Sequence, residues 1–69
     1  MADVFIEKNQ KADIAVTIYE PDGPGGRRYL NVRECGWARG DRFFTKKGFT
    51  ISLDKADELA DAIRQVARS

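Results

Sequence analysis

The stretch RFFTKKG, residues 42–48, places cations and aromatic rings side by side in this 69-residue chain. Lysine and arginine neutralise phosphates and aromatic rings stack on bases, so the mixture is typical of a surface that binds single-stranded nucleic acid. An alternative role for Lys46 and Lys47 is protection of an exposed strand edge against unwanted pairing. We favour phosphate contact, because the two lysines lie close to Phe43 and Phe44 in the chain.

Three further residues are candidates for the same surface. Lys8 ends a short alternating run, and Arg33 occupies an outward position of a predicted strand. Arg33 is either a phosphate contact or a solvated cation. Trp37 follows Gly36 in a predicted polar loop, where it either stacks on a base or packs at the rim of the core. The candidate nucleic-acid-binding residues are therefore Lys8, Arg33, Trp37, Arg42, Phe44, Lys46 and Lys47.

The charge of the chain is unevenly distributed. The net charge is +1, but residues 27–53 hold seven basic and two acidic side chains and are +5. Residues 1–26 are −3 and residues 54–69 are −1. A basic middle third on a nearly neutral chain predicts a polyanionic partner.

Several kinds of chemistry lack the residues they need. The chain has no histidine and one cysteine, Cys35, which argues against a metal site and against a disulfide within the chain. We expect Cys35 to be a half-buried thiol. No pair of nucleophile and base and no glycine-rich phosphate loop is apparent. We therefore predict a protein that is not an enzyme and uses no cofactor.

The hydrophobic pattern predicts four strands, at about residues 4–8, 13–20, 28–35 and 42–53. Polar or glycine-rich segments at 9–12, 21–26 and 36–41 are the predicted connections. The apolar positions of the alternating runs, among them Leu30, Val32 and Phe49, are expected to face the core. Gly48 is expected to allow a bulge or a positive φ.

One helix is predicted over residues 55–67, with Asp54 as its N-terminal cap. Its alanines, Leu59, Ile63 and Val66 form an apolar stripe, which we expect to pack on the sheet. The fold class is α+β, a single domain of residues 1–69 with a curved antiparallel sheet and one C-terminal helix. A chain this short is marginally stable alone, and the thin stripe also suits a second helix, so a homodimer is predicted.

The order of these features resembles the positive cofactor four family of transcriptional coactivators and single-stranded DNA-binding proteins. The resemblance rests on Leu30-Asn31-Val32-Arg33-Glu34, Lys46-Lys47-Gly48, Ile51-Ser52-Leu53 and the amphipathic helix. It implies a dimer whose sheets form a channel for melted DNA, with Arg33, Lys47 and Lys8 at phosphates. The chain departs from the family where Phe49-Thr50 precede Ile51. It also departs where Cys35 stands in place of an aromatic residue, so that one stacking surface is either missing or supplied by Trp37. Its short length resembles bacterial or phage members.

We therefore expect a non-enzymatic protein that binds single-stranded DNA, with single-stranded RNA as the alternative ligand. Its expected role is that of a transcription coactivator or DNA-maintenance factor. Possible partners include the transcription machinery. The other interpretation is a small dimeric protein-interaction module whose basic sheet docks on an acidic partner. The absence of a long apolar run predicts a protein with no signal peptide and no contact with a membrane. We expect it in the cytoplasm at the nucleoid, or in the nucleus of a eukaryote.

Overall fold

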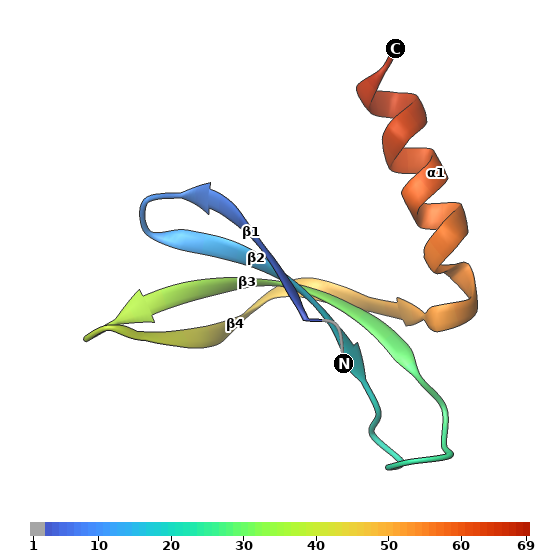
Figure 1. Ribbon diagram of the computed structural model, residues 1–69, viewed down its shortest axis with the longest axis horizontal. Helices are drawn as coiled ribbons and strands as arrows, with labels where there is room; N and C mark the ends of the chain where they lie inside the picture. The colour runs from blue at the N-terminus through green and yellow to red at the C-terminus, as the bar shows by residue number, and fades with distance from the viewer. Residues whose placement is uncertain (1–2) are drawn as a thin grey trace.

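A four-stranded antiparallel sheet followed by one helix makes up the computed structural model, which describes residues 3–69. The strands are β1 (Val4–Asn9), β2 (Ala12–Tyr19), β3 (Tyr29–Ala38) and β4 (Asp41–Ser52). A 3-10 turn, η1 (Leu53–Lys55), leads into α1 (Ala56–Ala67). The strands lie in sequence order, each paired with the next, in a strongly twisted sheet (Figure 1). The predicted α+β class is confirmed.

The two faces of the sheet differ in composition. Paired residues in antiparallel strands point to the same side, so the register assigns each side chain to a face. One, the aliphatic face, carries Val4, Ile6, Ile14, Val16, Ile18, Leu30, Val32, Phe49 and Ile51. The other, the aromatic–basic face, carries Phe5, Asp13, Ala15, Thr17, Tyr19, Tyr29, Asn31, Arg33, Cys35, Trp37, Arg42, Phe44 and Thr50.

The aliphatic face groups the residues that the alternation assigned to the core, but no second layer formed by residues 3–69 covers it. Phe49, expected in the core, is 47% exposed, and Val4 and Ile6 are more than half exposed. The fully buried residues, Ala15 and Cys35, lie on the aromatic–basic face. Cys35 was predicted to be half-buried, and that prediction is wrong because longer side chains on this face close over it.

The helix does not pack on the sheet, contrary to expectation. Figure 1 shows α1 rising away from the end of β4. Ile63 and Val66, in the middle and at the end of its apolar stripe, are 59% and 75% exposed. Asp54 also differs from its predicted role, because it lies within η1 and the residue that caps α1 is Lys55, which makes no side-chain capping bond. Asp57 and Glu58 in the first turn still stabilise α1, because their negative charges lie at the positive end of the helix dipole.

The connection between β3 and β4 is tighter than predicted. Strand β3 continues to Ala38, and only Arg39 and Gly40 form the turn, with φ of 54° and 83°. A two-residue turn with two positive φ values matches the twist of a hairpin. Trp37 therefore lies in a strand, opposite Arg42, and the prediction of a loop residue was wrong.

A bulge interrupts β4 where the two lysines lie. Arg33 pairs with Gly48 and Cys35 with Phe44, so three residues of β4 lie opposite Glu34 alone. The bulge predicted at Gly48 is present, but Gly48 is not among the residues with positive φ. Position 48 requires glycine because β3 passes close to it: a Cβ there would lie 2.3 Å from the carbonyl oxygen of Val32.

No helix within residues 3–69 combines the length and the apolar character needed to cross a membrane.

Candidate nucleic-acid interface

Arg42 links all four strands across the aromatic–basic face. From β4 its guanidinium donates a hydrogen bond of 2.9 Å from Nη2 to Oδ2 of Asp13 on β2. Its Cζ lies 3.8 Å from the ring centroid of Phe5 on β1 and 4.7 Å from that of Trp37 on β3. A planar cation can stack on aromatic rings and pair with a carboxylate at once. Arg42 is thus a candidate site residue whose guanidinium is already engaged.

The residues beneath Arg42 are small and buried. Cys35 and Ala15 are fully buried, and Asp13 is 9% exposed. Burial raises the pKa of the Cys35 thiol, with the nearby Arg42 lowering it and Asp13 raising it to smaller extents. A buried thiol with a raised pKa is a poor nucleophile, so we assign Cys35, which lies opposite Asp13 and Phe44, a packing role.

Exposed aromatic rings flank this cluster. Trp37 and Phe44 lie on the same face and are 46% and 56% exposed. One face of the Trp37 ring is occupied by Arg42, and exposed ring surface remains on both residues. Flat exposed rings beside cations are the components that sequence-tolerant stacking of bases requires.

Arg33 lies farther along the same face and is partly buried. Its Nε donates to Oδ1 of Asn31 at 3.2 Å, and its Nη1 donates to the carbonyl oxygen of Thr45 at 3.3 Å. Arg33 and Asn31 border a shallow recess with Tyr19 and Thr50. The guanidinium is held in place by neutral acceptors rather than by an acid, so its charge is available to an anion.

The remaining candidates lie at or behind the bulge. Lys46 and Lys47 are exposed within it. Lys47 borders a recess of the aliphatic face with Ile14, Val32 and Phe49, a recess that Arg33 and Glu34 also reach. Lys8 forms an ion pair of 3.0 Å with Glu34. Lys8 and Lys47 therefore share a side of the sheet that differs from the side of Trp37, Arg42 and Phe44.

The sequence did not single out four residues that the structure places at these sites. Phe5 and Asp13 contact the guanidinium of Arg42. Glu34 pairs with Lys8, and Lys11 borders a recess next to Glu34. For Asp13 a signal existed, since it is the one charged residue within β2 and a buried carboxylate needs a partner. For Lys11 no local pattern distinguishes it from an ordinary turn residue.

Comparison of the chain with models of protein families, with curated proteins and with solved structures finds no match.

Proposed function

We propose that this protein binds single-stranded DNA without catalysing a reaction. The observation that carries the proposal is the exposure of Trp37 and Phe44 on the same face as Arg33 and Arg42. Phosphates would be neutralised by Arg33, Lys46 and Lys47, and bases would stack on the exposed rings. The bulge, which brings Arg33 and Lys47 to one recess, supports a strand that passes at this point.

The binding unit in this proposal is a homodimer. Two apolar surfaces of the single chain are uncovered, namely the aliphatic face of the sheet and the stripe of α1. Apolar surface of this extent favours association, because covering it releases water from both copies. The resemblance of the chain to the positive cofactor four family points to the same assembly. A protein with this activity would work where melted DNA occurs, as a coactivator or a DNA-maintenance factor.

The test compares single-stranded and duplex oligonucleotides of equal length in a salt titration. Trp37 is the only tryptophan, so its fluorescence reports stacking directly, and we expect oligo-dT to quench it. Duplex DNA should bind more weakly, because its bases are not available to the rings. An oligo-U strand of the same length compares RNA with DNA. Equal affinity for duplex and single strands, without quenching, would contradict the proposal.

A pair of arginine variants locates the interface. Arg33→Ala should weaken binding to every sequence alike and flatten the slope of log affinity against log salt by about 0.7, the value expected for one phosphate contact on a single strand. Arg64→Ala is the matched control, because Arg64 is exposed on the helix and pairs with Asp61. Equal effects of the two variants would show that the sheet is not the binding surface.

The second candidate function is docking of the basic sheet on an acidic protein. The observation in its favour is that Arg42 already pairs with a carboxylate of this chain. The salt titration separates the two functions. An acidic protein surface offers no bases to the exposed rings, so a chain built to bind such a partner should show no preference for single-stranded over duplex DNA.

A further inference from the structure

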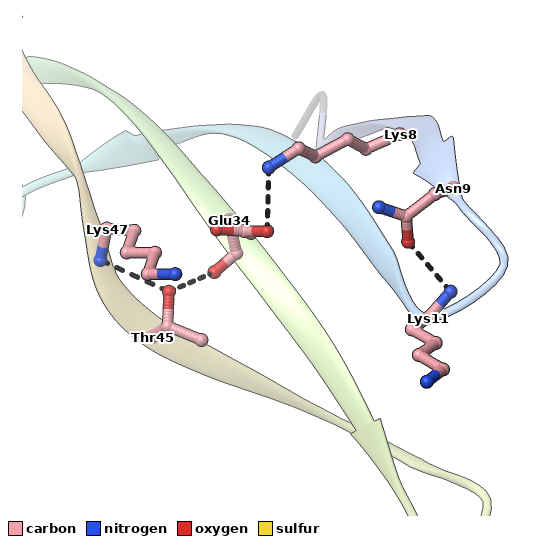
Figure 2. A network of polar contacts seen from close by, with 6 residues as sticks. All are labelled: Lys8, Asn9, Lys11, Glu34, Thr45 and Lys47. Carbon is pink, nitrogen blue, oxygen red and sulfur yellow. Dashed lines mark hydrogen bonds and ion pairs between the residues drawn. The ribbon is translucent and has the colours of Figure 1, made fainter.

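Glu34 lies at the centre of a group of lysines on the aliphatic side of the sheet. Its Oε1 accepts a hydrogen bond of 3.0 Å from Nζ of Lys8. Lys47 lies on the other side of Glu34 in the bulge of β4, whereas Lys11, in the turn between β1 and β2, points its side chain away from the carboxylate (Figure 2). The glutamate side chain is 16% exposed, whereas that of Lys8 is 49% exposed. One sheltered carboxylate thus lies between two cations from separate strands, Lys8 of β1 and Lys47 of β4.

Backbone contacts hold these elements around Glu34. The hydroxyl of Thr45 donates to the carbonyl oxygen of Glu34 at 2.8 Å and accepts from the backbone N–H of Lys47 at 3.1 Å. At the opposite end, the backbone N–H of Lys11 donates to Oδ1 of Asn9 at 2.8 Å and fixes the turn (Figure 2). The positions from which the lysines project are therefore set by the fold.

The charges of this group do not cancel. The hydrogen bond from Lys8, assisted by the positive charges of Lys8 and Lys47, lowers the pKa of Glu34, so the carboxylate is ionised at neutral pH. Two lysines against one glutamate leave an excess of positive charge. Two shallow recesses adjoin Glu34, one lined by Arg33, Lys47 and Gly48 and the other by Asn9, Lys11 and Ala12. An added anion therefore has both space and uncompensated cations.

We propose that the group of Lys8, Lys47 and Glu34 is a phosphate site in which Glu34 is an internal competitor. The carboxylate holds Lys8 in the free protein, and a phosphate of the bound strand takes its place at the lysine Nζ. Lysine suits this exchange, because its ammonium is a mobile point charge with three donors. Glu34 thereby weakens binding of the strand. The inference rests on the proposed function, and names Glu34, through its ion pair with Lys8, as a residue that sets the affinity of the same site.

Removal of the competing charge tests this proposal. Glu34→Gln should tighten binding of labelled oligo-dT by about fivefold at low salt, with less gain at high salt because the charge effect is screened. Glu58→Gln is the matched control, since Glu58 pairs with Lys55 on the helix and its loss changes the net charge equally. It should change affinity by less than about twofold, as expected for an exposed pair far from the site. In a Lys8→Ala background the gain from Glu34→Gln should shrink, because the two residues act on one contact.

A measurement on the unaltered chain covers the case in which Glu34→Gln disturbs the fold. The pKa of Glu34, followed by NMR of its carboxyl carbon, should rise when oligo-dT saturates the protein, because Lys8 is then engaged by phosphate. A pKa of Glu34 that stays lowered in the complex would overturn the proposal. If the chain binds oligo-dT but Glu34→Gln behaves like Glu58→Gln, this inference fails while the proposed function stands. If the unaltered chain does not bind oligo-dT, both fail.

Discussion

Arg42 shows how a residue that suits a ligand can be engaged by its own protein. Its guanidinium contacts Asp13, Phe5 and Trp37, which come from three different strands. Phosphate contact would require this cation to leave a carboxylate that is 12% exposed at its side chain. Leaving such a carboxylate unpaired is costly, so we assign Arg42 a structural role first.

Arg42→Ala is expected to lower the free energy of unfolding by about 2 kcal/mol, through loss of a charged hydrogen bond and of its stacking on two rings. Urea denaturation followed by circular dichroism measures this change. Arg64→Ala, which removes an exposed arginine from an ion pair of 2.8 Å, against 2.9 Å for Arg42 and Asp13, should cost about 0.5 kcal/mol or less. An Arg42→Ala protein as stable as the Arg64→Ala protein, but with weakened DNA binding, would make Arg42 a phosphate contact.

The sequence predicted which residue types form the candidate site but not which of them pair. Lys8 and Arg33 were identified from the period of the strands and the resemblance, and their faces follow from that period, whereas Trp37 was identified as a loop residue and its strand position was not predicted. The partners of Arg42 and Lys8 lie 29 and 26 residues away in the chain, so no local pattern reveals them. Long-range pairs depend on strand register, which the bulge of β4 alters.

At the scale of elements, the β4 bulge determines where the lysines lie. Three residues of β4 lie between the flanking pairs, against one residue of β3. Within the bulge, the hydroxyl of Thr45 donates to the carbonyl oxygen of Glu34 on β3 and accepts from the backbone N–H of Lys47. Gly48 closes the bulge by lying against β3, where a Cβ would be 2.3 Å from the oxygen of Val32 and 2.7 Å from Cα of Arg33. These neighbours are backbone atoms, which cannot yield without shifting the strand.

Gly48→Ala is therefore expected to destabilise the protein by about 1–3 kcal/mol, the range for forced overpacking. Thermal unfolding should show the loss as a lower midpoint. Gly40→Asn is the control, because Gly40 has open space around its Cα and asparagine tolerates the positive φ of this turn. Equal stability of the Gly48→Ala and unaltered proteins would show that the strand adapts and that glycine is not required there.

The elements themselves were largely predictable, since strand alternation and helical spacing are local signals. Four strands and one helix appear in the predicted order. The errors lie at the ends of the elements. The connection between β3 and β4 is shorter than the predicted loop of residues 36–41, and the turn η1, which contains Asp54, precedes the helix that Asp54 was predicted to cap. The packing of α1 was not predictable from its stripe, because periodicity shows that a face is apolar but not what covers it.

For the whole molecule, the uncovered apolar surface is the dominant feature. The fully buried side chains are Ala15 and Cys35, both small, so the core of the single chain contributes little burial. A sheet with one bare aliphatic face and a helix extended from it would be marginal in water. In the proposed dimer, a second copy would supply the missing burial by covering the stripe of α1 and the adjoining part of the aliphatic face at Leu30 and Ile51.

Ile63→Asp tests that dependence, because Ile63 lies mid-stripe on α1 and is 59% exposed in the single chain. In a dimer that covers the stripe, the new carboxylate would be buried without a partner, at a cost of several kcal/mol. Sedimentation equilibrium should give twice the mass of the 7.8 kDa chain for the unaltered protein and a single chain, folded or unfolded, for the variant. Gln65→Asp, which places the same residue on the polar side of the helix, should remain a dimer. A monomeric unaltered protein, or an Ile63→Asp protein that stays dimeric, would mean that α1 is not part of the contact between copies.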